Sequence, residues 1–245
     1  MSTFKDHFSG HADGYAAHRP VYPESLFAFL ASCCETHDLA WDCGTGNGQA
    51  ARSIAPHFES VVATDASAEQ IASAVPQVGL QFRVATAEES GIQSASVDLV
   101  TVAQALHWFD IDRFFNEASR VLKPRGVLSV WCYERCKVNP ACDDIIEKIF
   151  AEVESYWPPE RDLVEDHYGS INLPFPEMPV DAFSMEASWA ADNMLAYMRT
   201  WSASQRYMRD NGTDPTSNLV DALRAAWGPG RRSVRWPITL KAGRK

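Results

Sequence analysis

Between residues 39 and 133 the sequence alternates short apolar runs with amphipathic stretches, and this alternation limits the possible folds most. The apolar runs have the length of strands, whereas the stretches between them have helical spacing and end at proline or glycine. Repeated strand–helix units of this kind predict a parallel sheet with helices on both faces. The predicted strands are residues 39–43, 61–64, 80–84, 97–102 and 127–133, and the predicted helices are residues 24–36, 49–55, 68–75 and 111–122.

The regular alternation ends after about residue 134. A helix is predicted over residues 143–157, and a proline-rich connection follows it as far as residue 179. The remaining predicted elements are a strand over 180–189, helices over 193–201 and 219–227, and a strand over 233–241. Because Pro237 has no backbone N–H, we expect that last strand at a sheet edge or at a bulge.

The charge of the chain disfavours two classes of partner. Lys and Arg number 22 and Asp and Glu number 32, so the net charge is −10. Nucleic-acid binding needs a basic surface, and anionic membranes attract basic segments. We therefore expect neither partner, and we expect a cytoplasmic location because the first residues resemble no signal peptide. No metal site is expected, because the six cysteines form no C-x-x-C pair and His7, His11 and His18 lack an acidic partner.

The most informative short motif is the glycine-rich turn of residues 42–48, which reads Asp-Cys-Gly-Thr-Gly-Asn-Gly. It lies between a predicted strand and a predicted helix, where glycines allow a positive φ and a close approach of the backbone to a ligand. Asp65 ends the next predicted strand, and an acid there can accept hydrogen bonds from both hydroxyls of a ribose.

Two cofactors suit a turn of this kind. A dinucleotide needs a third glycine or an alanine where this chain has Gln49, and the Asp42 carboxylate would repel its pyrophosphate. S-adenosylmethionine (SAM) has a ribose, an adenine and an ammonium group but no phosphate. The residues therefore favour SAM, with S-adenosylhomocysteine as the product. A nicotinamide-dependent oxidoreductase and a turn that binds nothing remain as alternatives.

At this point the chain resembles the class I SAM-dependent methyltransferases that act on small molecules. The turn of residues 42–48 matches their first motif, Asp65 their ribose acid and residues 86–88 their adenine loop. Residues 121–126 match their L-K-P-G-G turn, although Arg125 replaces a glycine. The resemblance implies a Rossmann-like α/β fold with a mostly parallel seven-stranded sheet.

The resemblance also implies one methyltransferase domain over residues 1–245. Within it we expect an N-terminal lid (1–25), a SAM-binding core (26–135), a substrate-side insertion (136–179) and C-terminal strands and helices that complete the sheet (180–245).

Three further segments are similar to trans-aconitate methyltransferase-like proteins. They are the Y-x-x-x-R-P-x-Y-P lead-in at residues 15–23, the Q-A-x-H-W-F segment at 104–109 and the T-W-S segment at 200–202. Substrates diverge within such a group, so this resemblance specifies the cofactor better than the methyl acceptor.

The resemblance assigns a role to each predicted site residue. Arg19 would pair with the methionyl carboxylate, Asp42 would orient the ammonium and Ala87 would bind adenine through its backbone N–H. The expected cofactor-binding residues are Tyr15, Arg19, Asp42, Gly44, Thr45, Gly46, Gly48, Asp65, Ala66, Ala87, Glu88 and Gln104. The expected acceptor-side residues are His107, Trp108 and Trp201.

The predicted reaction is methyl transfer to an oxygen nucleophile of a small molecule, such as a carboxylate, which gives a methyl ester. His107 is the candidate base for a hydroxyl acceptor, whereas a carboxylate needs no deprotonation and leaves it an orienting role. The cationic clamp would come from Arg199, Arg206, Arg209 or Arg235. An N- or C-methyltransferase and a non-catalytic SAM-binding protein are the alternatives, and the chain could be a monomer or a homodimer.

Overall fold

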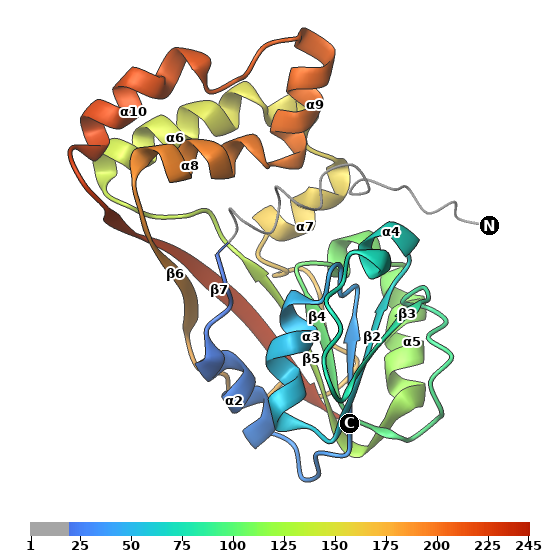
Figure 1. The fold of residues 1–245 in the computed structure, drawn as a ribbon. Helices are drawn as coiled ribbons and strands as arrows, with labels where there is room; N and C mark the ends of the chain where they lie inside the picture. Colours follow the sequence, from blue (N-terminus) through green and yellow to red (C-terminus); the bar gives the residue numbers. More distant parts are fainter. Residues whose placement is uncertain (1–19) are drawn as a thin grey trace.

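The computed structural model describes residues 20–245 and is built on one seven-stranded sheet with the strand order β3–β2–β1–β4–β5–β7–β6 (Figure 1). The strands from β3 to β5 run parallel, and β7 runs antiparallel to both β5 and β6. The predicted mostly parallel seven-stranded sheet is thereby confirmed. The strands are β1 (Leu39–Cys43), β2 (Ser60–Asp65), β3 (Leu80–Val84), β4 (Val97–Ala103), β5 (Leu122–Tyr133), β6 (Phe183–Trp189) and β7 (Arg232–Arg244).

Helices cover both faces of the sheet, as predicted. Helices α2 (Glu24–Ser32) and α3 (Gln49–Ile54) share one apolar core, to which β5 contributes Trp131. Helix α5 (Ile111–Val121) lies on the opposite face, where Phe114 packs 6.1 Å from the Trp41 ring. The short helix α4 (Ala68–Ala72) contacts β2 and β3.

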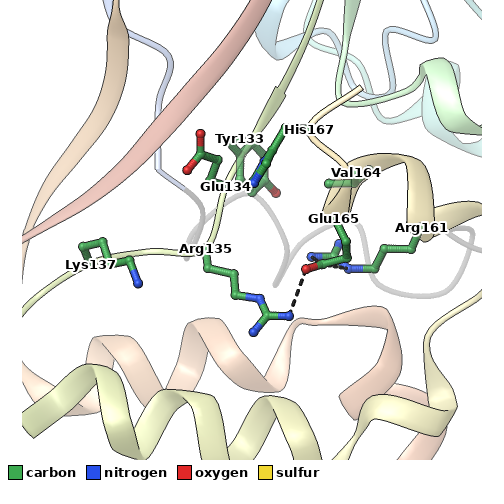
Figure 2. A pocket seen from close by; sticks show the side chains of 8 residues that line it. All are labelled: Tyr133, Glu134, Arg135, Lys137, Arg161, Val164, Glu165 and His167. Atoms are coloured by element: carbon green, nitrogen blue, oxygen red, sulfur yellow. Dashed lines mark hydrogen bonds and ion pairs between the residues drawn. The ribbon is translucent and has the colours of Figure 1, made fainter. Parts of the chain in front are cut away.

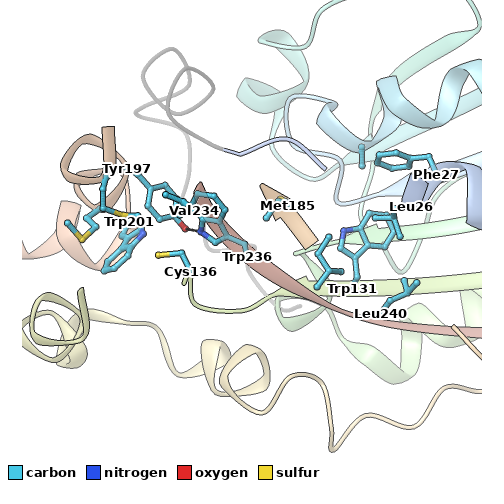
Figure 3. Close-up of a cluster of buried hydrophobic side chains, with 14 of the residues drawn as sticks. Leu26, Phe27, Trp131, Cys136, Met185, Tyr197, Trp201, Val234, Trp236 and Leu240 are labelled. Carbon is cyan, nitrogen blue, oxygen red and sulfur yellow. Dashed lines mark hydrogen bonds between the residues drawn. The ribbon is translucent and has the colours of Figure 1, made fainter. Parts of the chain in front are cut away.

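A second group of helices packs together beyond one end of the sheet (Figure 1). Its members are α6 (Pro140–Glu152), α8 (Ala191–Arg199), α9 (Ser202–Asn211) and α10 (Val220–Trp227). Figure 3 shows how aromatic side chains join this helical layer to strand β7. Tyr197 packs against Trp201 and Trp236 with ring centroids 5.8 and 5.5 Å away, and its hydroxyl accepts a hydrogen bond from the Trp236 indole at 3.2 Å.

Short helical segments connect these layers. Helix α7 (Asp162–Glu165) follows a 3-10 turn at Pro159–Arg161, which contacts the 3-10 turn Leu106–Trp108. The other 3-10 turns are Ala55–His57, Glu154–Tyr156 and Ser217–Leu219. Within residues 20–245, no helix has the length and apolar character to cross a membrane, and no three metal-ligating side chains are grouped to hold an ion.

Strand β7 corrects the prediction that Pro237 marks a sheet edge. The strand lies inside the sheet, between β5 and β6. Pro237 is tolerated there because it lies opposite Glu134, just past the end of β5, where its missing N–H breaks no hydrogen bond of the strand ladder. Its carbonyl accepts a hydrogen bond from the Glu134 N–H at 2.8 Å. The next pair along is Lys137 with Arg235, which is displaced by one residue from the β5–β7 register. Of the two predicted placements, a sheet edge or a bulge, the structure therefore agrees with an irregularity beside Pro237.

Candidate functional site

The glycine-rich turn connects the carboxyl end of β1 to helix α3, as predicted. Gly44, Gly46 and Gly48 all have positive φ angles, of 68°, 55° and 87°. The Thr45 N–H donates to the Thr64 carbonyl at 2.9 Å, which fixes the turn to the end of β2. A Cβ atom added at Gly48 would lie 2.6 Å from the Phe82 ring, so the protein itself fills that side of the turn.

Gly46 differs from the other two glycines in its surroundings. The nearest atom to an added Cβ would be the Gln70 Oε1 at 3.6 Å, an ordinary contact distance. Among residues 20–245, the turn is therefore open at Gly46 and closed at Gly44 and Gly48. This opening beside Asp65 fits a nucleoside that lies across the turn.

The Asp42 carboxylate is enclosed by the protein. It has no exposed surface, and its two oxygens accept hydrogen bonds from the Thr45 hydroxyl at 2.6 Å and the Thr101 hydroxyl at 2.7 Å. Burial raises the pKa of Asp42 to about 6. In this structure the Asp42 carboxylate stabilises the turn through its hydrogen bond with Thr45. Its predicted contact with an ammonium group stays a prediction.

Asp65 lies at the end of β2, facing the turn. Its two oxygens accept hydrogen bonds from the Gly46 N–H at 2.8 Å and the Ser67 N–H at 2.9 Å. A carboxylate can accept about four hydrogen bonds, so these contacts orient Asp65 without exhausting its capacity. Ala66, which is half-buried, follows it directly. Asp65 is thus held where ribose hydroxyls could reach it.

The predicted adenine loop follows β3. Ala87 is buried, and the Glu88 carboxylate accepts a hydrogen bond from the Asp110 N–H at 3.0 Å. Glu88 therefore ties this loop to the segment that follows β4. The adenine loop and the glycine-rich turn lie at the same edge of the sheet, because the loop follows the carboxyl end of β3 and the turn that of β1, and these strands run parallel.

Gln104 directly follows β4 and has a φ of 55°, in the left-handed region that is unusual for a residue other than glycine. Its backbone N–H donates to the Trp131 carbonyl, and its side-chain oxygen accepts from the Tyr133 N–H, both at 2.8 Å. These contacts fix Gln104 to β5. Its side-chain NH₂ group is left as the donor that can serve a ligand.

His107 lies one turn further along and is 8 % exposed. Its Nδ1 atom is 3.1 Å from the hydroxyl of Tyr168, and its ring is 4.7 Å from that of Trp108. Burial, with a smaller contribution from the positive charge of Arg161, lowers the pKa of His107 to about 3. The imidazole is therefore neutral at physiological pH. The sequence did not point to Tyr168, which lies far along the chain from His107.

Trp201, the third residue predicted on the acceptor side, lies within the helical layer. Trp201 is 7 % exposed and packs among Phe150, Trp157 and Tyr197, with ring centroids 5.8, 6.0 and 5.8 Å away. These contacts put it in the core of the helical layer, so its contact with an acceptor stays a prediction. Tyr15 and Arg19 lie outside the residues that the structure describes.

A pocket of about 280 Å³ opens where β5 ends, beside helix α7 (Figure 2). This pocket could not be predicted from the sequence, because its walls come from two separate segments. The lining residues are Tyr133, Glu134, Arg135, Lys137, Arg161, Val164, Glu165 and His167. The pocket is next to the segment that holds His107, because the turns Leu106–Trp108 and Pro159–Arg161 are in contact.

The pocket holds three cationic side chains. Arg135 pairs with Glu147 and, at 2.9 Å, with Glu165, which also pairs with Arg161 at 3.0 Å. The Lys137 ammonium is exposed and has no ion-pair partner among the residues of the described chain. The guanidinium groups of Arg135 and Arg161 are thus held in place by ion pairs, whereas the Lys137 ammonium can approach a ligand.

The arginines that the sequence suggested as a clamp do not line this pocket. Arg199 pairs with Asp214 at 2.6 Å, and Arg206 donates to the Tyr156 carbonyl at 3.3 Å. Arg209 belongs to α9, and the backbone of Arg235 pairs with Lys137. Charge alone could not distinguish these arginines from Arg135 and Arg161.

Comparison with known proteins identifies the family. Residues 41–130 match the model of a methyltransferase domain. A Dictyostelium discoideum protein named as a methyltransferase is 32% identical over 229 residues, which cover 91% of this chain and 87% of that protein. This chain belongs to the methyltransferases. It is therefore an enzyme of the class that takes its methyl group from SAM.

Two further relatives agree with this assignment. The yeast protein CRG1, named as an S-adenosylmethionine-dependent methyltransferase, is 25% identical over 238 residues, 80% of each chain. A solved structure from Anaeromyxobacter dehalogenans, titled as a type II methyltransferase, superposes with a TM-score of 0.87 at 40% identity and covers 92% of this chain and 97% of that one. None of these relatives is named for trans-aconitate, so the narrower resemblance stays a prediction.

Proposed function

We propose that this methyltransferase acts on a carboxylate oxygen of a small molecule and forms a methyl ester. The observation that carries the proposal is the pocket at the end of β5, in whose walls the cations Arg135, Lys137 and Arg161 outnumber the acids Glu134 and Glu165. Cationic groups suit carboxylate recognition, and guanidinium groups can donate two parallel hydrogen bonds. We therefore propose these three residues as the cationic clamp, in place of the four arginines expected from the sequence.

The state of His107 supports an acceptor that needs no general base. An imidazole with a pKa of about 3 is a weak proton acceptor at neutral pH. A free carboxyl group has a pKa of about 4, so it is already ionised at neutral pH. One carboxylate oxygen attacks the methyl carbon, the carbon–sulfur bond breaks and its electron pair stays on sulfur. No proton is transferred in this step.

The cofactor would supply an activated methyl group on a sulfonium. We propose that Asp65 binds the ribose hydroxyls, that the open turn at Gly46 admits the nucleoside and that the Ala87 N–H meets adenine. We propose that the NH₂ group of Gln104 donates toward the methionyl end or the acceptor; its left-handed backbone and the bond of its side-chain oxygen to the Tyr133 N–H support this role. Tyr15, Arg19, Asp42, Thr45, Ala66 and Glu88 keep their predicted supporting roles.

The division of the chain follows the same proposal. Residues 26–135 would hold the cofactor, and residues 136–179 would supply the acceptor side, because Arg161 and the other pocket residues of α7 lie in that segment. Residues 1–25 would act as a lid. Lys137 would draw the acceptor carboxylate in, since Glu165 already holds both arginines in position.

The test is methyl transfer from methyl-labelled SAM to a panel of small mono-, di- and tricarboxylic acids, with their amides as controls. Base treatment releases volatile methanol from a methyl ester but not from an N- or C-methylated product. We expect base-labile label with the acids and none with the amides. Base-stable label would instead support the N- or C-methyltransferase alternative. Binding of S-adenosylhomocysteine without transfer to any acceptor would support the non-catalytic alternative.

A further inference from the structure

The contact between His107 and Tyr168 restricts the imidazole beyond keeping it neutral. Tyr168 is fully buried, and its hydroxyl lies 3.1 Å from the His107 Nδ1. Within the part of the chain that the structure describes, this hydroxyl has no other hydrogen-bond acceptor. The buried phenol proton therefore has one acceptor within reach, the His107 Nδ1.

Counting donors decides the direction of the side-chain hydrogen bond. A tyrosine hydroxyl has one proton to donate and lone pairs that accept. Tyr168 is buried away from water and its hydroxyl has no other acceptor among the described residues, so its proton is satisfied only when it is donated to the His107 Nδ1. The Nδ1 atom is then the acceptor, and a neutral imidazole with an unprotonated Nδ1 carries its proton on Nε2.

The backbone around Tyr168 indicates that this arrangement is held under strain. His167 and Tyr168 both have a φ of 54°, so two successive residues other than glycine are in the left-handed region. Such conformations persist only where the surroundings enforce them. The Tyr168 N–H donates to the Leu163 carbonyl at 2.9 Å, which anchors the strained pair to α7.

We infer that Tyr168 is a positioning residue that locks His107 in its Nε2–H tautomer, so that His107 presents a hydrogen-bond donor to an anionic acceptor. Among residues 20–245, no side chain or backbone group is hydrogen-bonded to Nε2, whereas Nδ1 is bonded to the Tyr168 hydroxyl. In the Nε2–H tautomer the one lone pair, on Nδ1, is already engaged by the Tyr168 hydroxyl, so none is available to accept a proton from an acceptor molecule. The donor role rests on the proposed carboxylate acceptor, but the tautomer does not.

Nuclear magnetic resonance of the full chain, with ¹⁵N-labelled histidine and S-adenosylhomocysteine present, reads the tautomer directly. Long-range proton–nitrogen correlations distinguish a protonated ring nitrogen from one with a lone pair. The chain has seven histidines, and the loss of one signal in His107→Gln would assign the ring. We expect protonated Nε2 at neutral pH. Protonated Nδ1 would overturn the inference and leave the proposed function untouched.

The Tyr168→Phe variant removes only the hydroxyl and keeps the buried ring. We expect His107 to populate both tautomers in it, and an unchanged tautomer would mean that Tyr168 does not set the proton position. Titration with acetate, the simplest carboxylate, should shift the Nε2 signal of the original protein, whereas acetamide should not. An Nε2–H ring that ignores acetate would overturn the donor role. Only the additional absence of methyl ester formation would overturn the proposed function.

Discussion

A Cβ atom added to Gly44 would lie 2.6 Å from the Cβ of Ala105, far inside the separation at which two carbon atoms attract. The Phe109 ring would be 2.9 Å from the same atom. The glycine-rich turn after β1 is therefore in direct contact with the segment after β4. This contact joins the turn proposed to bind the cofactor to the segment that leads to His107.

The Gly44→Ala substitution should accordingly be more harmful than a left-handed backbone alone explains. The positive φ costs about 1–2 kcal/mol and overpacking about 1–3 kcal/mol, so we expect a loss of about 3 kcal/mol of unfolding free energy in urea. Gly91→Ala is the matched control, because Gly91 has a φ of 67° but no atom of residues 20–245 lies within 4 Å of an added Cβ. Equal losses in the two variants would refute a tight contact at Ala105.

Arg125 replaces the glycine of the family's L-K-P-G-G turn and has a φ of 66°. Arg125→Gly should therefore stabilise the protein, by about 1 kcal/mol, because glycine adopts this conformation without a steric penalty. Arg125 also pairs with Glu35, but both side chains are exposed and such a pair contributes little. Arg125→Ala removes that pair and keeps the strain, so urea unfolding should show no gain for this control.

Asp65→Ala should weaken binding of S-adenosylhomocysteine about tenfold or more, measured by isothermal titration calorimetry. Hydrogen bonds to a carboxylate contribute about 1.5–3 kcal/mol, and the variant also frees the N–H groups of Gly46 and Ser67. Asp112→Ala, at an exposed position of α5, should bind like the original protein. Unchanged affinity in the Asp65 variant would exclude a ribose contact there.

Asp42 should give the protein a distinctive dependence of stability on pH. Its pKa is about 6 in the folded chain and about 3.9 in an unfolded one, so the folded state holds the proton more tightly. The tighter proton binding adds about 3 kcal/mol to the unfolding free energy below pH 4, and this added stability is lost as the pH rises to 6. Asp42→Asn lacks it. Between these pH values, the urea stability of the original protein should fall relative to that of the variant; parallel curves would contradict the shift.

Lys137→Met should raise KM for a carboxylate acceptor about tenfold and leave the affinity for S-adenosylhomocysteine unchanged, because it removes a charged hydrogen-bond donor of the pocket and keeps the apolar stem. Lys148→Met on α6 is the control, since Lys148 is exposed and does not line the pocket. If both variants behaved alike in steady-state kinetics, general surface charge rather than the pocket would attract the acceptor.

The sheet could be predicted from the sequence because its determinants are local. Strand β1 spans the predicted residues 39–43, and the glycine-rich turn follows it as expected. Each buried parallel strand is a short apolar run, so its position shows in the sequence. Helix α9 has no such pattern: within Ser202–Asn211 only Ala203 and Ser204 are buried, and its polar surface does not reveal its helical period.

The acceptor side could not be predicted for a different reason. Arg135, Arg161 and Glu165 meet only because α7 folds back against the end of β5, and no spacing in the sequence encodes that meeting. The same holds for His107 and Tyr168. Pro237 misled the prediction because its effect depends on where the neighbouring strand β5 stops, which is a property of the assembled sheet.

The interior position of β7 also bears on how the chain folds. Trp131 of β5 pairs with Leu240, and β6 joins the sheet only through β7. Until β7 has been synthesised, the N–H and C=O groups along one side of β5 have no strand to bond with, and an open strand edge invites pairing with other chains. The nascent protein therefore carries an aggregation-prone edge from the completion of β5 at Tyr133 until β7 begins at Arg232. Closing it requires contacts of high sequence separation, which slow folding.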